Sequence, residues 1–297
     1  MITTIALLSF VFVLGILLRS WYERHHLTVA NYSIETDKLG KEWNGYTFAV
    51  LADLHDNEFG QENKDLMAQI KMACPDAILI AGDMMVVKEW KKKNLKVTRT
   101  LIKQLASQYP VFYGNGNHEQ RMRENSEAYP GWYEEFQQIL KENRVHYLSD
   151  DTITLEKGGT KLTISGLDID RKYYEKGKKV EMEPGLVTRK LGRPDPSIFH
   201  VLLAHTPLYL EEYEQWGADL VLSGHFHGGT IRLPIMGGVM SPQCQFFTAR
   251  DRGLIRFNRT RMIVSGGLGT HSINIRLNNY PQLVVVRLKC VEPEIEK

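Results

Sequence analysis

Cysteine is scarce in this sequence and follows no pattern. The chain of 297 residues holds three cysteines, Cys74, Cys244 and Cys290, which lie far apart and form no C-x-x-C pair. An odd number at wide spacing argues against a disulfide framework, and the lack of paired cysteines argues against a thiolate metal site.

An excess of one charge sign is also missing. The 37 basic and 35 acidic side chains leave a net charge of +2, which is too small to imply wrapping of nucleic acid. No internal repeat or low-complexity tract is present. Hydrophobic residues make up 43% and charged residues 24%, so the composition excludes disorder, collagen and coiled coil and favours a packed globule.

The first 18 residues lack charged side chains altogether, and Ile5 to Leu18 is almost wholly apolar. As a helix this segment would be roughly 27 Å long, which is close to the thickness of the bilayer core. We therefore expect residues 1–26 to form a retained membrane anchor. A cleaved signal peptide and a buried core helix are the alternatives, but the basic start and small-residue cleavage site of a signal peptide are missing.

The flanks of this segment predict its orientation. Trp21 and Tyr22 suit the headgroup layer, and Arg19 and Arg24 place positive charge after the apolar run. By the positive-inside rule, we expect a single-pass protein of the cell membrane with the rest of the chain in the cytoplasm.

From Tyr46 onward, short apolar runs alternate with longer amphipathic stretches, which predicts one α/β domain over residues 45–290. The expected strands are Thr47–Ala52, Ala77–Ala81, Val111–Gly114, Leu162–Ser165, His200–Ala204, Leu220–Ser223, Met262–Ser265 and Leu283–Leu288. The expected helices are Gln61–Ala73, Leu95–Ser107, Gly131–Glu142 and Leu208–Trp216. The stretch 171–196 has little periodicity and is interpreted as a long surface insertion.

Polar clusters follow five of these strands. They are Asp53-Leu54-His55, Gly82-Asp83, Gly116-Asn117-His118-Glu119, His205 and Gly224-His225-Phe226-His227. Because the carboxyl ends of strands form the binding crevice of an open α/β sheet, we expect the clusters to converge. Carboxylate, amide oxygen and imidazole are the ligand types that hold Mn, Fe, Zn or Mg, and seven such groups suffice for two ions.

The spacing within the clusters suggests how they reach one site. Asp53 and His55 are two residues apart, as are His225 and His227, and on extended chain such pairs point to the same side. Glycines at positions 82, 116 and 224 would let the backbone turn sharply at the strand ends.

The ordered set D-x-H, G-D, G-N-H-E, H and G-H-x-H resembles the calcineurin-like metallophosphoesterase superfamily, over roughly Tyr46 to Leu288. The later segments Gly266-Gly267-Leu268-Gly269 and Ile275-Arg276-Leu277 are similar to a bacterial membrane-associated subgroup. The resemblance implies a four-layer α/β/β/α sandwich, to which the sequence adds an N-terminal transmembrane helix.

The resemblance also implies roles for the matching residues. One divalent metal ion would be held by Asp53, His55 and His227, and a second by Asn117, His205 and His225, while Asp83 would bridge both. His118 corresponds to the catalytic histidine of the family, which stabilises the transition state and can protonate the leaving oxygen.

Two positions depart from the family pattern. Protein phosphatases have G-D-x-x-D, whose second Asp orients the catalytic histidine, but Val86 stands at that position here. Protein phosphatase activity is therefore disfavoured. The family's usual G-N-H-D is G-N-H-E here, with Glu119 in place of the Asp. It is left open whether Glu119 holds His118.

Basic residues gather at 88–96 and 171–179, with Trp90, Tyr173 and Tyr174 among them. Such a surface suits an anionic membrane or phospholipid headgroup, although an ordinary solvated face has the same composition. We expect a dinuclear metal-dependent hydrolase of a phosphomonoester or phosphodiester that acts at the membrane, on a substrate such as a lipid-linked ester. A non-catalytic metal-binding interaction module on the same fold and a nuclease are the alternatives; the low net charge speaks against nucleic acid as a partner.

Overall fold

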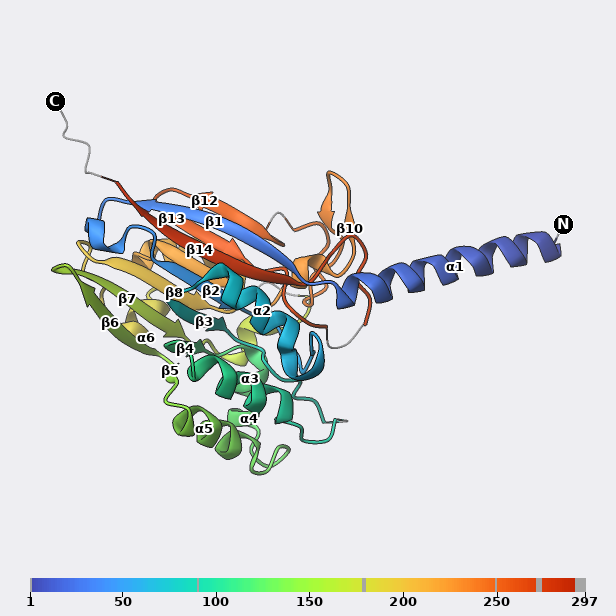
Figure 1. Ribbon diagram of the computed structural model, residues 1–297, viewed down its shortest axis with the longest axis horizontal. Coiled ribbons are helices and arrows are strands. Elements are labelled where there is room, and N and C mark those ends of the chain that lie inside the picture. Colours follow the sequence, from blue (N-terminus) through green and yellow to red (C-terminus); the bar gives the residue numbers. More distant parts are fainter. Residues whose placement is uncertain (1, 90, 178–179, 249, 271–273, 292–297) are drawn as a thin grey trace.

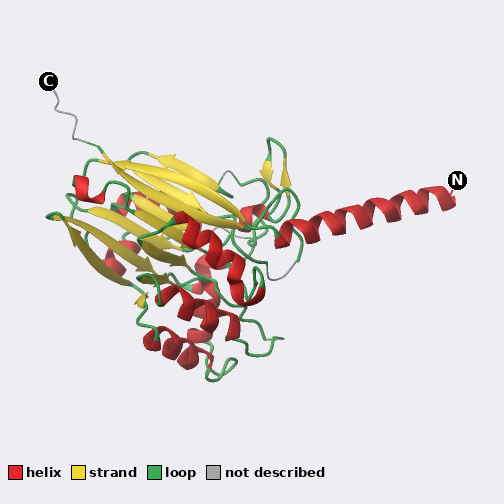
Figure 2. Ribbon diagram, viewed as in Figure 1, coloured by secondary structure: helices red, strands yellow, loops and turns green. Residues whose placement is uncertain are grey.

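Two six-stranded sheets pack face to face and carry helices on their outer faces (Figures 1 and 2). The computed structural model describes residues 2–89, 91–177, 180–248, 250–270 and 274–291. Trp90, Lys178 and Lys179, which belong to the basic segments singled out in the sequence, lie outside the described residues, as does Met1 of the expected anchor.

The first sheet has the strand order β1-β14-β2-β3-β4-β5. Its strands are β1 (Thr28–Thr36), β14 (Gln282–Cys290), β2 (Thr47–Leu51), β3 (Ala77–Ala81), β4 (Val111–Gly114) and β5 (His146–Leu148). β14 runs antiparallel to β2, and every other neighbouring pair is parallel.

The second sheet has the order β12-β13-β9-β8-β7-β6. Its strands are β12 (Gly253–Phe257), β13 (Thr260–Val264), β9 (Leu220–Ser223), β8 (Phe199–Ala204), β7 (Thr160–Leu167) and β6 (Asp151–Lys157). The inner pairs are parallel, and the two edge strands β12 and β6 run antiparallel to their neighbours. A two-stranded hairpin, β10 (Arg232–Leu233) and β11 (Gly237–Gly238), stands apart from both sheets.

Three hydrophobic cores separate four layers, because successive side chains on a strand point to opposite faces. On β2, Ala49 and Leu51 pack under the helices of the first sheet, whereas Phe48 and Val50 pack between the sheets. Strands of the second sheet divide in the same way between the central core and a third core under their own helices. The predicted four-layer α/β/β/α sandwich is confirmed.

Helices cover each sheet according to their apolar faces. The first sheet carries α2 (Lys64–Ala73), α3 (Lys96–Ala106), α4 (Asn117–Glu124) and α5 (Trp132–Glu142), and the second carries α6 (Leu186–Leu191) and α7 (Leu210–Trp216). The expected helix Gln61–Ala73 is interrupted, because Glu62 and Asn63 have positive φ values of 53° and 60° and end a short 3-10 turn before α2. The helix expected from Leu208 likewise opens as the 3-10 turn Pro207–Tyr209.

Segment 171–196 is more ordered than the sequence indicated. It contains the 3-10 turn Arg171–Tyr174 and the helix α6, and Tyr173 and Leu186 are buried in the third core. The interpretation of Tyr173 as an aromatic anchor on the surface was therefore wrong, because its ring packs inside the domain.

The N-terminal helix α1 (Ile2–His25) projects from one end of the domain (Figure 1). Within the described residues it is the one helix long and apolar enough to cross a membrane, a test that a signal sequence would also pass. The alternative of a buried core helix is excluded, because its apolar stretch is wholly exposed.

Candidate metal centre

The five polar clusters come together where the carboxyl ends of strands from both sheets meet. β2, β3 and β4 of the first sheet lead to the clusters at residues 53–55, 82–83 and 116–119, and β8 and β9 of the second lead to His205 and residues 224–227. The expected convergence is thus observed, and it draws on two sheets rather than one.

Asp53, His55 and His227 form a first buried group of potential ligands. The Nε2 atoms of His55 and His227 lie 3.2 Å apart, and Asp53 Oδ1 lies 3.8 Å and 3.6 Å from them respectively. These three residues are the set expected for one metal ion.

Asp83, His205 and His225 form a second buried group. His205 Nε2 lies 3.2 Å from Asp83 Oδ2, and the rings of His205 and His225 are 5.2 Å apart. Asp83 Oδ2 also lies 3.8 Å from His55 Nε2, so this carboxylate is within reach of both groups. Its position suits the bridging role that the resemblance implies, although the ligand assignment itself stays a prediction.

Asn117 opens α4 and lines the same cavity. Its Oδ1 atom is buried and has no hydrogen-bond partner among the residues that the structure describes. A buried polar oxygen without a partner is costly unless a ligand satisfies it, which fits the expected role of Asn117 as a metal ligand.

The backbone at the site explains how these residues converge. Five of the expected ligands have left-handed φ values between 50° and 66°, namely Asp53, His55, Asp83, His225 and His227. Such conformations are uncommon for residues other than glycine and gather at functional sites. The extended-chain explanation for the paired spacings was therefore wrong, although the side chains do converge.

The glycines also act differently from the expectation. Gly82 has a φ of 87° and allows a sharp turn, but Gly116 keeps an ordinary φ of −104°. A Cβ on Gly116 would lie 2.3 Å from Asp83 Oδ1, and one on Gly224 would lie 2.6 Å from Asp53 Oδ2. These two positions require glycine because the carboxylates need the space.

The electrostatics of the site favour positive charge. Burial opposes ionisation of Asp83, but the imidazoles of His205 and His118 outweigh it and hold the pKa of Asp83 well below its usual range. Burial likewise opposes a charged His205, yet the Asp83 and Asp53 carboxylates raise the pKa of His205 to about 10. The field that attracts a proton to His205 would also attract divalent cations.

Backbone carbonyls fix the orientation of two imidazoles. His205 Nδ1 lies 2.7 Å from Ala81 O, and His227 Nδ1 lies 3.1 Å from Gly269 O. An Nδ1–H that donates to a carbonyl turns Nε2 toward the carboxylates, which is the arrangement typical of metal-ligating histidines. The donor set and its orientation therefore fit a metal centre.

The main chain fixes the ring of His118 at Nδ1, while the backbone N–H of His118 donates to Asp83 Oδ1 at 2.8 Å. The Val87 backbone N–H donates to His118 Nδ1 at 2.7 Å. Because Nδ1 accepts this bond, the neutral ring carries its proton on Nε2, and the side chain lines the cavity. Val87 follows Val86, the position of the missing Asp, so the backbone orients the ring where the protein-phosphatase pattern would use a carboxylate.

Glu119 serves a different purpose. Its carboxylate accepts hydrogen bonds from the backbone N–H groups of Asp83, Met84 and Gly116 at 2.9–3.0 Å and from Tyr113 Oη at 2.6 Å. It thus stabilises the two loops that present Asp83 and Asn117. Burial and the negative charge of Asp83 raise the pKa of Glu119 to about 7, although the hydrogen bonds from Tyr113, Asp83 N–H and Met84 N–H oppose the shift.

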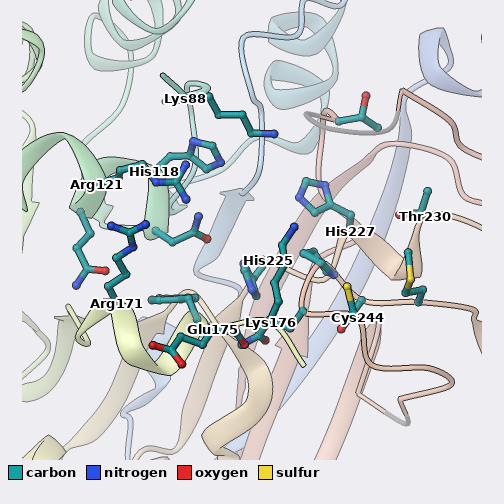
Figure 3. Close-up of a pocket in the computed structure, with 18 of the residues that line it drawn as sticks. Lys88, His118, Arg121, Arg171, Glu175, Lys176, His225, His227, Thr230 and Cys244 are labelled. Atoms are coloured by element: carbon teal, nitrogen blue, oxygen red, sulfur yellow. The ribbon is translucent and has the colours of Figure 1, made fainter. Parts of the chain in front are cut away.

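A cavity of about 470 Å³ opens over the site and is lined by His118, His225 and His227 (Figure 3). Five cationic side chains also line it, Lys88, Arg121, Arg171, Lys176 and Arg276, against one acidic side chain, Glu175. Burial and the charges of Arg121 and Lys176 lower the pKa of Lys88, which shows how closely the cations are grouped. Such a cavity favours an anionic ligand.

Sequence reasoning gave no role to Arg276, whose guanidinium is fully buried beside the site. Nη1 donates to Gly266 O at 2.9 Å and Nη2 to Gly269 O at 2.8 Å, so Arg276 holds the loop whose carbonyl orients His227. The sequence signal that could have identified Arg276 was the similarity of segments 266–269 and 275–277 to a bacterial subgroup. Nothing in the sequence showed that these two segments are in contact.

The chain is similar to several known proteins. The chain is 27% identical to an uncharacterized metallophosphoesterase of Campylobacter jejuni over 88% of this chain and 63% of that protein, so it spans less than two thirds of that relative. It is 24% identical to the phosphodiesterase YaeI of Escherichia coli over 82% of each chain. Among solved structures, it resembles the calcineurin-like phosphoesterase YfkN of Bacillus subtilis with a TM-score of 0.46 and 14% identity, over 76% of this chain and 82% of that one.

The family profile described as calcineurin-like phosphoesterase matches residues 46–229, a range that contains all seven expected ligands and His118. This chain therefore belongs to the calcineurin-like phosphoesterase family.

Proposed function

We propose that this chain hydrolyses a phosphomonoester or phosphodiester with two divalent metal ions, and that it does so at a membrane surface. The observation that carries the proposal is the convergence of six buried Asp and His ligands, Asn117 and His118 under one basic cavity. Members of the family are metal-dependent phosphoester hydrolases and typically use a dinuclear metal centre.

In the proposed site, Asp53, His55 and His227 hold one ion, Asn117, His205 and His225 hold the other, and Asp83 contacts both. When bound, two such ions polarise a phosphoryl oxygen and lower the pKa of a water molecule. The protein supplies the oriented ligands, the buried setting that strengthens electrostatic interactions and the cationic cavity that binds the substrate.

His118 acts in this proposal as a hydrogen-bond donor. Because Val87 N–H occupies Nδ1, Nε2–H faces the cavity and can donate to a phosphoryl or leaving oxygen. Giving that proton away completely would leave an imidazolate, which is unfavourable. Stabilisation of developing negative charge is therefore favoured over full proton transfer.

The substrate class follows from the cavity and from α1. The five cationic side chains suit an anionic ester, while Tyr174, Met240 and Pro242 in the lining offer apolar contact. The apolar helix α1 would restrict the domain to a bilayer surface, with the domain in the cytoplasm as the flanking charges predict. We therefore infer a lipid-linked phosphoester as the substrate, and the relative YaeI, named a phosphodiesterase, is compatible with a diester.

The test is hydrolysis of aryl phosphomonoesters and phosphodiesters by the purified full chain, loaded in turn with Mn, Fe, Zn or Mg. We expect turnover with at least one metal and about two metal equivalents per chain, the number typical of two-metal sites. Asp83→Ala should lose both metal and activity, because the loss of a shared carboxylate leaves two cations repelling each other. His146→Ala, which changes an exposed histidine of β5, is the matched control and should retain both.

Two outcomes would contradict the proposal. Metal binding without turnover of any ester would favour the non-catalytic interaction module. Two full metal equivalents in Asp83→Ala would refute the bridging assignment while leaving the hydrolase intact.

A further inference from the structure

The last turn of α1 packs against the domain and forms hydrogen bonds with it. Ser20 and Glu23 are buried, Ser20 Oγ accepts a hydrogen bond from Arg276 N at 3.0 Å, and Glu23 Oε2 accepts one from Asn279 N at 2.9 Å. The apolar run ends at Leu18, two residues before Ser20, which is about 3 Å along a helix axis. If α1 spans a bilayer, the face around its base must lie directly against the headgroups.

The β10–β11 hairpin starts from the same segment. Arg232 N donates to Leu277 O at 2.9 Å, and Asn278 Nδ2 donates to Arg232 O at 3.2 Å. Residues 276–279 therefore join the hairpin on one side to the last turn of α1 on the other. Figure 1 shows the hairpin at the end of the domain from which α1 leaves.

This hairpin and the loop after it expose large apolar side chains. Ile235 at the tip is fully exposed, and Met236 and Phe246 are more than half exposed. Leu233 and Phe247 are also exposed, and Phe247 N donates to Val239 O at 3.1 Å, which ties the loop back to the hairpin. We call these five residues the apolar tip: Leu233, Ile235, Met236, Phe246 and Phe247. A contiguous exposed group of this kind marks an interaction surface.

The segment between the two parts of the apolar tip reaches the metal centre. Met240, Pro242 and Cys244 line the cavity, and Gln243 is buried with its Nε2 donating to Tyr173 O at 3.1 Å. A partner that covers the apolar tip would therefore meet the rim of the cavity, where cations favour anionic groups.

We propose that the apolar tip inserts into the interface of the bilayer that α1 crosses, so that the cavity opens at the level of the headgroups. The occupant is a phospholipid surface, because the tip adjoins the base of an exposed membrane-length helix and because phenylalanine, leucine and isoleucine are the side chains that enter this interface. The inference rests on the anchored placement in the proposed function, but it does not depend on catalysis.

The experiment measures depth directly in the full chain. Cys74, Cys244 and Cys290 are first changed to Ser, so that Ile235→Cys carries the only fluorophore. The labelled chain is placed in nanodiscs of phosphatidylcholine and phosphatidylglycerol that contain nitroxide-labelled lipid. The matched control is Val291→Cys, an exposed apolar residue just after β14. The nine residues of β14 span about 30 Å, and Figure 1 places their far end away from α1.

We expect the label at position 235 to be quenched by the nitroxide lipid several-fold more than the label at position 291. When the same chain also carries Phe246→Ser and Phe247→Ser, the label at position 235 should be quenched less, because these changes weaken insertion of the apolar tip. Equal quenching at the two positions in chains that resist alkaline extraction would overturn the inference alone. Release of the chain by that extraction would overturn the anchored placement and this inference together. The proposed hydrolysis of phosphoesters would still stand, because it is tested separately on soluble esters.

Discussion

At the scale of single residues, the main chain takes over a task that a carboxylate performs in protein phosphatases. Val86 cannot orient His118, but the next backbone N–H, that of Val87, donates to its Nδ1. The backbone N–H thus fixes the ring through Nδ1, and a neutral ring that accepts this bond carries its proton on Nε2.

This arrangement predicts a graded series at His118. His118→Ala should keep two metal equivalents and lower kcat by roughly 10²–10³, the usual effect of removing one donor to developing negative charge. His118→Gln should recover part of the rate, because its amide N–H can reach the place of Nε2–H. Metal analysis and steady-state kinetics, with His146→Ala as the control, check this.

An equal loss in His118→Gln and His118→Ala, together with the loss of a basic limb from the pH–rate profile, would instead indicate proton transfer by His118.

The convergence of the candidate residues could be predicted from sequence, but their geometry could not. Order along the chain and position after strands were enough to select Asp53, Asp83 and His205. The left-handed backbone at Asp53 and Asp83 depends on close packing against Gly224 and Gly116, which lie far away in the chain. A single sequence without structure does not show such long-range contacts, and the extended-chain explanation failed for this reason.

At the scale of elements, alternating apolar runs predicted the inner strands well, because these strands are buried on both faces. The edge strands β1, β5, β6 and β12 were missed because they are short or only partly buried and their hydrophobic signal is weak. α4 was missed because Met122 is its one apolar residue, and its run of polar residues resembled a loop although His118, Glu119 and Gln120 are buried.

The most consequential element is the last turn of α1, which sequence patterns assigned to the membrane boundary alone. Glu23 is fully buried and accepts hydrogen bonds from Asn279 N and, at 2.6 Å, from Arg19 Nε. Asn279 Nδ2 in turn donates to His227 O at 2.7 Å. A short chain of hydrogen bonds thus joins the helix to a proposed metal ligand.

We therefore predict that Glu23→Ala destabilises the fold by about 1.5–3 kcal/mol, the typical effect of losing a hydrogen bond to a charged group. It should also weaken metal binding, because Asn279 no longer fixes the backbone at His227. Glu23→Gln, which keeps an acceptor oxygen, should restore most of the metal affinity. Thermal unfolding and metal titration of the full chain measure the two effects.

Glu35→Ala is the matched control, since Glu35 is exposed and its pair with Lys289 lies on the surface. Metal affinity that is equal in Glu23→Ala and Glu35→Ala would show that the last turn of α1 does not influence the site.

At the scale of the whole molecule, the apolar helix α1 and the hairpin lie at one end of the sandwich (Figure 1), and the cavity opens over the strand ends that carry the site residues. This placement follows from topology, because the carboxyl ends of β2, β3, β4, β8 and β9 all face the same end. A substrate held in the bilayer would then reach the cavity without leaving the membrane surface, and anchoring would raise its effective concentration without any new contact.

Two truncated chains separate the effect of membrane anchoring from the effect of the hydrogen bonds between the last turn of α1 and the domain. A form that starts at Arg19 lacks the apolar run but keeps Ser20 and Glu23, whereas a form that starts at Leu27 lacks both. We expect the Arg19 form to hydrolyse soluble aryl esters as the full chain does, and to lose roughly 10²-fold in kcat/KM on a phosphoester carried in lipid vesicles. The Leu27 form should in addition lose metal affinity and stability, because Arg276 N and Asn279 N lose their acceptors. If the Arg19 form and the full chain had the same ratio of vesicle to soluble activity, the membrane-borne substrate would be refuted, and the phosphoester hydrolase would stand as an enzyme of soluble esters.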